Sequence, residues 1–251
     1  MLTPQRQQQI LQQLAEQGQV LSKQLSVLFE VSEDTIRRDL RDMAKAGLLQ
    51  RVYGGALPAS AATATFSQRQ QVAVASKRAI AKKAAGLISA GQVVIIDGGT
   101  TTTELLNHIP KDLSFTVVTH SPTIAVGLAD FPLVDVVLIG GKLFKHSVVA
   151  VGAGAMESIA RIQADLFFMG VTGVHPEAGL TTGDYEEACI KRALAGRAAE
   201  TVVLASAEKV NAASAYAIGD ITIANTLVVE AGTDSAWLQV IQQKGVVVLS
   251  D

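Results

Sequence analysis

From Ser76 to the end of the chain, short uninterrupted runs of valine, isoleucine and leucine alternate with segments of helical periodicity. Runs such as QVVIID and TVVLAS are too continuously apolar for strands that turn one face to water, so they predict strands covered on both faces. Buried strands separated by helices are typical of a parallel sheet. The pattern predicts an α/β domain with a parallel sheet.

Three short amphipathic segments occupy the N-terminal end of the chain. The first covers residues 5–16 and ends at Gly18, a helix stop signal. The second covers residues 20–29, with Ser22 expected as its N-cap, and the third is expected to begin after Ser32, which also suits a cap. Three short helices in succession predict a helix-turn-helix.

The third segment has one apolar and one basic face. At about 100° per residue, Ile36, Leu40 and Met43 share one side of the helix. The basic residues fall on the other half of the wheel: Arg37, Arg38, Arg41 and Lys45. A run of arginines on a helix is often no more than a solvated face. Here the chain carries a net charge of −2, so its basic residues form a local patch rather than a general one.

The next stretch, GLLQRVYGGA, predicts a β-wing. Gly47 ends the third helix, residues 48–53 are expected to form a short strand pair, and Gly54 and Gly55 turn the chain. A capped basic helix followed by a hairpin that carries Arg51 is the order that places a helix in a DNA major groove and a basic wing on the backbone beside it. DNA binding is therefore favoured over a solvated face.

The run from QRQQQILQQL to RVYGGAL resembles the N-terminal domain of DeoR-family bacterial transcriptional regulators over about the first 57 residues. Two motifs carry the resemblance: Ser-x-x-Thr-Ile-Arg-Arg-Asp-Leu and Gly-Leu-x-x-Arg-x-x-Gly-Gly-Ala. It implies double-stranded operator DNA as a partner, with contacts from a recognition helix and a wing. The residues implied on the recognition helix are Ser32, Thr35, Arg37, Arg38 and Arg41, and those on the wing are Arg51 and Tyr53.

A compositional change divides the chain. The stretch LPASAATATFSQR is rich in alanine, serine and threonine and shows no periodic apolar face, which is typical of a linker. We expect a winged helix-turn-helix domain over residues 1–57, a linker over residues 58–75 and an α/β effector-binding domain over residues 76–251.

Ligands of parallel α/β sheets bind at the carboxyl ends of the strands. Three glycine-rich loops lie at such positions: IDGGTTTTELL, LIGGKLFKHS and TGVHPEAGLTTGDYEE. In the first, backbone amides, hydroxyls and the start of a helix converge, an arrangement that suits an oxyanion. A glycine pair by itself indicates only a tight turn. The four consecutive threonines that follow it are the reason for predicting a phosphate or carboxylate site.

These loops also resemble the DeoR-family sensor domain, which is related in fold to ribose-5-phosphate isomerase and typically recognises a phosphorylated sugar. The resemblance spans nearly the whole chain and implies a phosphorylated sugar effector. The expected effector-binding residues are Asp97, Gly98, Gly99, Thr100, Thr101, Thr102, His120, Gly140, Gly141, Lys142, Gly152, Gly179, Thr181, Asp184, Glu187 and Lys209. The chain departs from the family pattern at His120, at Ser206 and at Glu208, so its ligand is expected to differ from a typical family effector.

Several classes of function are not supported. The four histidines lack metal-ligand spacing, and no metal or cofactor is expected. A single cysteine precludes an intramolecular disulfide, the N-terminus lacks the pattern of a signal peptide, and no apolar run is long enough to span a bilayer. We expect a cytoplasmic protein without a membrane partner.

The favoured function is a DNA-binding transcriptional regulator, a repressor, whose operator affinity a phosphorylated sugar or related metabolite controls. Paired half-sites require paired helices, so we expect a homodimer or homotetramer. The alternative is an isomerase-like enzyme that uses Asp97, Asp184, Glu186 and Lys209 for acid/base chemistry. A third option is a metabolite-binding module whose N-terminal helices contact proteins.

Overall fold

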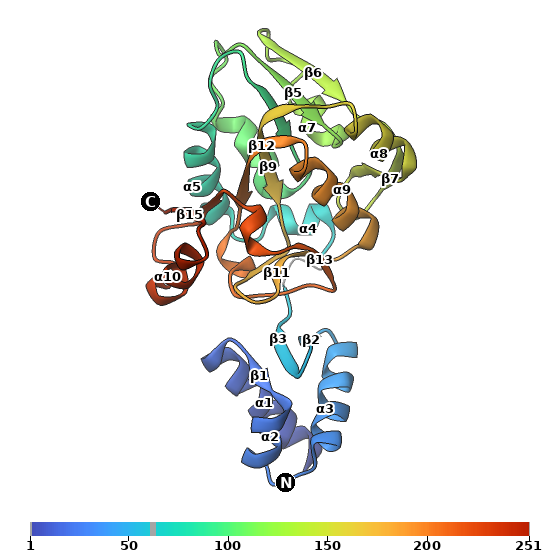
Figure 1. The fold of residues 1–251 in the computed structure, drawn as a ribbon, viewed down its shortest axis with the longest axis vertical. Helices are drawn as coiled ribbons and strands as arrows, with labels where there is room; N and C mark the ends of the chain where they lie inside the picture. Colours follow the sequence, from blue (N-terminus) through green and yellow to red (C-terminus); the bar gives the residue numbers. More distant parts are fainter. Residues whose placement is uncertain (1, 61–63, 251) are drawn as a thin grey trace.

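A computed structural model describes residues 2–60 and 64–250 of the chain. Figure 1 shows a small N-terminal unit, with the chain leaving it after β3 to enter a larger unit of mixed helices and strands. The expected winged helix-turn-helix and parallel α/β units are both confirmed. Residues 61–63 of the expected linker lie outside the described residues.

The N-terminal unit packs its helices against a small antiparallel sheet with the strand order β1-β3-β2. Its elements are α1 (Thr3–Gln17), β1 (Val20–Leu21), α2 (Ser22–Leu28), α3 (Glu33–Lys45), β2 (Leu49–Val52) and β3 (Gly55–Pro58). The apolar face of α3 lies in the core with Ile10 of α1, because Ile36, Leu40 and Met43 are at most 1% exposed. The predicted wing is the β2–β3 hairpin.

Two of the three predicted helix signals are confirmed, and one is wrong. Gly18 is left-handed at φ +73° and donates its N–H to Leu14 at 3.0 Å, while the Ser32 hydroxyl accepts from the Thr35 N–H at 3.2 Å. Ser22 is not an N-cap, since it lies inside α2 and Leu21 precedes the helix. The reason is that Val20 and Leu21 pair with β3 as a strand.

A buried ion pair joins α1 to α3. Arg6 Nε lies 2.5 Å from Asp39 Oδ2, and the two side chains are 6% and 5% exposed. Within the Arg-Arg-Asp motif, Asp39 is buried, whereas Arg37 and Arg38 are exposed. The pair sets the position of the basic helix on the rest of the unit.

The larger unit is built on a sheet whose described strands are all parallel, in the order β15-β14-β12-β9-β4-β5-β6. The strands are β4 (Val93–Ile96), β5 (Phe115–Thr119), β6 (Val134–Leu138), β9 (Ala164–Gly170), β12 (Ala198–Leu204), β14 (Thr226–Val228) and β15 (Val247–Leu249).

Helices cover both faces of this sheet. They are α5 (Val74–Ala85), α6 (Thr100–Leu105), α7 (Pro122–Gly127), α8 (Ala153–Ile159), α9 (Tyr185–Ala195) and α10 (Ser235–Gln243), with the 3-10 helices η2 (Leu106–His108), η3 (Ala207–Lys209) and η4 (Ile221–Ile223). The buried apolar residues of α8, α9 and α10 belong to one cluster, and those of α5, α6 and α7 belong to another.

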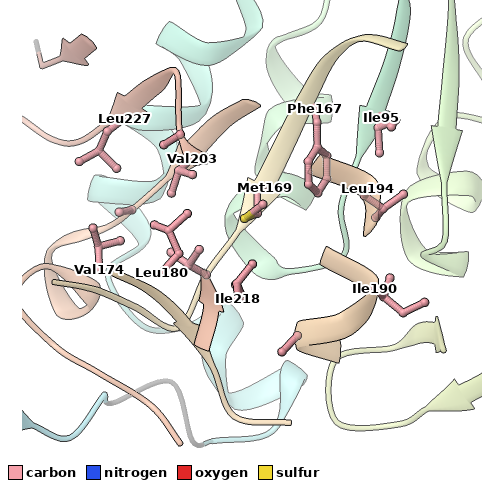
Figure 2. Packing of buried hydrophobic residues seen from close by; sticks show 14 of the residues in the cluster. Ile95, Phe167, Met169, Val174, Leu180, Ile190, Leu194, Val203, Ile218 and Leu227 are labelled. Carbon is pink, nitrogen blue, oxygen red and sulfur yellow. The ribbon is translucent and has the colours of Figure 1, made fainter. Parts of the chain in front are cut away.

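The alternation of side chains along each strand explains why both clusters form. Ile95 of β4 belongs to the cluster with α9, whereas Val94 and Ile96 belong to the one with α5. In Figure 2, Phe167 and Met169 of β9 lie between Ile190 and Leu194 of α9 and Val203 of β12, within the first cluster. The central strands need continuous apolar runs because they are buried on both faces, whereas Val137 and Leu138 of the edge strand β6 are exposed.

A second, antiparallel sheet was not predicted. It has the order β10-β11-β13, formed by β10 (Gly173–His175), β11 (Gly179–Thr182) and β13 (Tyr216–Gly219). A hairpin of β7 (Lys142–Phe144) and β8 (Val149–Val151) was likewise expected to be loop. Strands of three or four residues are too short to show a periodicity in the sequence.

The segment expected to be a linker contains ordered structure. Ala59 pairs with Ala213, α4 (Phe66–Gln70) follows, and α5 begins at Val74. The domain limits 1–57, 58–75 and 76–251 stay a prediction.

The order of the strands contains a topological switch point. The larger unit begins with β4 in the middle of the sheet, runs outward through β5 to β6, and then returns to β9 on the other side of β4. The direction of winding therefore reverses between β4 and β9. Crevices at the carboxyl ends of strands beside such a switch point are the usual ligand sites of open α/β sheets.

Asp39→Ala is expected to destabilise the N-terminal unit by about 3 kcal/mol, because it leaves Arg6 buried without its carboxylate. The measurement is urea unfolding followed by far-UV circular dichroism and by fluorescence of Trp237, the single tryptophan, which lies in the larger unit. Part of the helical signal should be lost at lower urea while the Trp237 transition stays in place. Asp42→Ala, at an exposed position of the same helix, is the control. Equal midpoints for both variants would contradict a stabilising role for the pair.

Candidate DNA-binding surface and candidate effector cavity

The outer face of α3 presents the basic residues that the sequence predicts. Arg37, Arg38 and Arg41 are exposed. Arg37 lies 2.9 Å from Glu33 and Arg38 lies 3.7 Å from Asp34, both one helical turn earlier on the same helix. Exposed pairs of this kind are weak, so a DNA phosphate can replace the carboxylate partners at low cost.

The wing adds a basic and an aromatic side chain. Arg51 is exposed on β2, and Tyr53 in the turn after it is fully exposed. A tyrosine whose ring is fully exposed contributes nothing to the core, and it is available for contact with DNA. Ser32 and Thr35 hydrogen bond to each other at the start of α3, so capping already occupies their hydroxyls.

In the larger unit, a cavity lies at the switch point. The loops after β4 and β9 and the η3 segment after β12 line it. Parts of α4 and α5, side chains of α9 and the residue Thr182 before α9 also contribute to the lining. The lining residues are Arg69, Val72, Lys77, Gly98, Gly99, Thr100, Thr101, Thr102, Ser147, Gly170, Val171, Thr172, Thr182, Glu187, Lys191, Glu208 and Lys209. The cavity volume is about 20 Å³, room for about one water molecule.

The charge of the lining favours an anion. Among the described residues that line the cavity, the basic side chains are Arg69, Lys77, Lys191 and Lys209, and the acidic ones are Glu187 and Glu208. The two carboxylates leave an excess of positive charge. Because Lys77, Lys191 and Lys209 are at most 6% exposed, water screens this charge poorly and an anionic ligand is attracted strongly.

Asp97, at the end of β4, anchors the floor of the cavity without lining it. Its Oδ1 lies 2.8 Å from His120 Nε2, and its Oδ2 accepts from the Gly170 N–H at 2.9 Å and from Lys191. Burial alone raises the pKa of this carboxyl, but Lys191 and His120 outweigh it and hold the pKa below the usual value. Burial likewise opposes the charge of Lys191, and Asp97 and Glu187 raise its pKa above the usual value.

His120 is fully buried between two oxygens. Besides Asp97, its Nδ1 lies 2.9 Å from the Ala150 carbonyl oxygen. Both ring nitrogens lie within hydrogen-bond distance of an oxygen atom. His120 therefore holds Asp97 and the β8 strand in place and does not reach the cavity.

Lys209 is the cavity lysine whose charge changes with pH near pH 8. Its ammonium group donates to Thr101 Oγ1 at 2.9 Å. Burial lowers the pKa of Lys209 to about 8, with Lys77, Arg69 and Lys191 acting in the same direction and Glu208 opposing them. A bound anion favours the protonated form, so ligand binding and protonation of Lys209 support each other.

The threonines of the first loop have unequal roles. Thr102 and Thr103 donate their hydroxyls to the Gly99 carbonyl and so start α6. Thr101 accepts from Lys209 and lines the cavity, as does Thr100. Gly99 has a φ of +141°, which side-chain-bearing residues rarely adopt. The loop therefore serves both the helix and the cavity.

The structure brings together part of the expected effector-binding set. The expected residues that line the cavity are Gly98, Gly99, Thr100, Thr101, Thr102, Glu187 and Lys209. Those that do not line it are Asp97, His120, Gly140, Gly141, Lys142, Gly152, Gly179, Thr181 and Asp184. Lys142 is exposed and pairs with Glu186, Asp184 caps α9 by accepting from the Glu187 N–H, and Thr181 accepts from the Ser214 N–H. Ligand contacts by any of these residues stay a prediction.

Sequence reasoning missed the basic residues Arg69, Lys77 and Lys191. Arg69 and Lys77 lie at or beside the expected linker, where polarity is ordinary and gives no sign of burial. Lys191 follows Glu187 by one turn of α9, a spacing typical of a surface pair. Only the fold reveals these three residues, because it brings α4, α5 and α9 together at the cavity.

Two family descriptions match the chain. The DeoR-like helix-turn-helix domain matches residues 6–61, and the DeoR C terminal sensor domain matches residues 72–231. The chain belongs to the DeoR family. Like its relatives, this DeoR-family chain is a DNA-binding transcriptional regulator. The basic α3 and wing lie in the first matched region, and the cavity lies mostly in the second.

Named relatives of this DeoR-family chain are transcriptional regulators along nearly their full length. The regulator GlpR of Haloferax volcanii is 32% identical over 99% of this chain and 98% of its own. The repressor GlcR of Bacillus subtilis is 28% identical over 96% and 93%, and the glycerol-3-phosphate regulon repressor of Escherichia coli is 27% identical over 94% and 94%. Among solved structures, ribose 5-phosphate isomerase A of Methanocaldococcus jannaschii shares 17% identity over 53% of each chain, with a TM-score of 0.40.

No helix between residues 2–60 or 64–250 has the length and apolar character required to cross a bilayer. Over the same ranges, no three histidine, cysteine, aspartate or glutamate side chains come together as a metal site.

Arg38→Ala is expected to weaken DNA binding about tenfold and to make the slope of log affinity against log salt shallower by about 0.9, the value for one lost phosphate contact. The measurement is a fluorescence-anisotropy titration at several salt concentrations. Arg161→Ala, which removes an equally exposed arginine from the larger unit, should bind as the parent does. An Arg38→Ala variant with the parent's affinity and slope would remove Arg38 from the DNA-binding surface.

The affinity of the cavity for a phosphate monoester is expected to fall as pH rises above about 8, where Lys209 loses its proton in the free protein. Between pH 7 and 9.5 the ligand stays a dianion, because its second pKa is about 6, so the change belongs to the protein. Calorimetric titration should show loss of up to about tenfold per pH unit above pH 8. Lys209→Met should bind more weakly and without this dependence. Parallel pH profiles for the parent and the variant would exclude Lys209 as the titrating group.

Proposed function

We propose that the chain is an effector-responsive repressor: the N-terminal unit binds operator DNA, and a phosphorylated sugar or related metabolite binds the cavity and changes operator affinity. The observation that carries the proposal is the buried excess of positive charge at the topological switch point. The names of the relatives, which include a repressor of the glycerol-3-phosphate regulon, support the same class of effector.

The cavity wall is connected to the DNA-binding unit in two ways. Arg69 and Val72 belong to α4 and its exit, which follow directly from the segment between the two units. The Ser60 hydroxyl donates to the carbonyl oxygen of Thr172, a cavity residue in the loop after β9. A ligand that displaces either wall therefore acts directly on the connection to the winged helix.

We propose that the effector displaces part of the cavity wall. The cavity has room for about one water molecule, and a more open wall provides the space that a sugar phosphate needs. The part that moves in this proposal is the short helix α4. The Lys77 ammonium group holds the Arg69 carbonyl in α4 and the Val72 carbonyl two residues after it. An effector phosphate attracts Lys77 and weakens these bonds. The effector thus favours one arrangement of the linker over the other, which linkage requires.

We also propose that the chain is not an isomerase. The alternative needs Asp97 as an acid or base, but Asp97 is bound to Lys191, His120 and the Gly170 N–H and does not line the cavity. Asp184 is engaged as the cap of α9. An assay with ribose 5-phosphate should show no conversion above the buffer rate, and turnover by the parent that is lost in Lys209→Met would favour the enzyme.

We propose a homodimer or a larger even assembly as the DNA-binding form. One basic helix reads one half-site, and two-fold operators require a second copy. Analytical ultracentrifugation of the protein with one operator duplex should give two chains, or a multiple of two, for each duplex.

The test of the proposed function is a titration of the DNA upstream of the chain's own gene, with and without glycerol 3-phosphate, ribose 5-phosphate, glucose 6-phosphate or fructose 6-phosphate. Salt-sensitive binding that one of these compounds weakens at least tenfold is the expected result. Binding that none of them changes would contradict control by a sugar phosphate, and absence of DNA binding in every condition would contradict the regulator itself.

Ser60→Ala is expected to leave DNA affinity and effector affinity each near the parent value, because Ser60 touches neither ligand. It should reduce the factor by which the effector changes DNA affinity by about threefold, since it removes the hydrogen bond from the linker to Thr172. Operator titrations at zero and saturating effector give this factor. Ser67→Ala, at an exposed position of α4, is the control. An unchanged factor would exclude the Ser60 hydroxyl from the coupling.

A further inference from the structure

Glu208 places a carboxylate in a cavity that otherwise favours anions. It lies in η3, directly after β12, and lines the cavity beside Lys209. Its Oε1 accepts from the Ser206 hydroxyl at 2.7 Å. Its Oε2 is buried and, within the described part of the chain, has no hydrogen-bond partner. A buried carboxylate oxygen without a donor is costly, so it implies a partner that the ligand-free protein does not supply.

The neighbouring lysines do not fill this role. The Lys77 ammonium donates to the carbonyl oxygens of Arg69 and Val72, and the Lys209 ammonium donates to Thr101. Burial lowers the pKa of both lysines, and the negative charge of Glu208 acts in the opposite direction on each. The carboxylate thus contributes to the field of the cavity but receives no hydrogen bond from it.

The cavity also contains an unsatisfied donor. Arg69 Nε is buried and has no acceptor among the described residues, although its guanidinium donates through another nitrogen to the His146 carbonyl oxygen at 3.1 Å. The lining therefore presents one free donor on a cation and one free acceptor on a carboxylate. Inorganic phosphate as a dianion carries acceptors and a single P–OH donor on one small group, so it satisfies Arg69, but Glu208 repels its two negative charges. A molecule with a phosphate at one end and hydroxyl donors at the other satisfies both.

We propose that Glu208 is a specificity-determining residue that accepts a hydrogen bond from a hydroxyl group of the effector. The effector class is then a phosphate monoester of a polyol or sugar with a free hydroxyl, and inorganic phosphate binds more weakly. This inference rests on the proposed function of the cavity and adds the group that distinguishes an effector from phosphate itself.

Glu208→Gln separates the two effects, because it keeps the shape of the side chain and removes its charge. Affinity for the sugar phosphate should fall about tenfold, since a hydrogen bond to a charged acceptor becomes one to a neutral acceptor. Affinity for inorganic phosphate should rise about threefold, since a repelling charge is removed. If Glu208 had only a structural role, its replacement would lower the affinity for both ligands together.

The experiment is calorimetric titration of the full chain with inorganic phosphate and with glycerol 3-phosphate, ribose 5-phosphate, glucose 6-phosphate and fructose 6-phosphate. The measured quantity is the ratio of the dissociation constant of inorganic phosphate to that of the tightest sugar or polyol phosphate. In Glu208→Gln this ratio should fall by more than tenfold, and in Glu208→Ala further still. Glu157→Gln, the same change on the exposed face of α8, should leave it unchanged. Circular dichroism and Trp237 fluorescence confirm that each variant is folded.

Each other outcome overturns a distinct statement. An unchanged ratio in Glu208→Gln excludes Glu208 as the discriminating group. A parent protein that binds inorganic phosphate as tightly as every sugar or polyol phosphate overturns the inference and leaves an anion cavity. A parent that binds neither inorganic phosphate nor any of the four compounds overturns the proposed function of the cavity along with the inference.

Discussion

Asp97 is the residue on which the geometry of the cavity depends. Its carboxylate joins the end of β4 to His120 after β5, to the Gly170 N–H at the end of β9 and to Lys191 on α9. These are the elements that meet at the topological switch point. A fully buried carboxylate is tolerated because each of its oxygens has a donor, and its positive partners keep it ionised. The fixed framework of the cavity follows from this one cluster.

Opposite this framework lies the part of the wall that connects to DNA binding. α4 carries Arg69 to the cavity, and Lys77 holds the carbonyl end of α4. The sheet thus forms one side of the cavity, and a short helix next to the linker forms another. In the proposed function, the effector displaces this helix, and its binding energy changes the position of the winged helix.

The sequence predicted the winged helix-turn-helix, the parallel sheet and the separate basic and apolar faces of α3, because these features depend on local patterns. Periodicity separated Ile36, Leu40 and Met43 from the arginines of α3, and continuous apolar runs identified strands buried on both faces. The cavity could be predicted only in part. The loop from Gly98 to Thr102 lies at a strand end and was found, whereas Arg69 and Lys191 reach the cavity through tertiary packing that no spacing reveals. Strands β10 and β11 were missed because they are too short to show a period.

If an effector in the cavity controls operator affinity, as proposed, thermodynamic linkage makes the reverse effect obligatory. The most direct measurement is calorimetric titration of the sugar phosphate that releases the operator into the free protein and into the protein saturated with operator. The account predicts that operator weakens effector binding by the same factor by which effector weakens operator binding. Equal effector affinity for the free and operator-bound protein would contradict it.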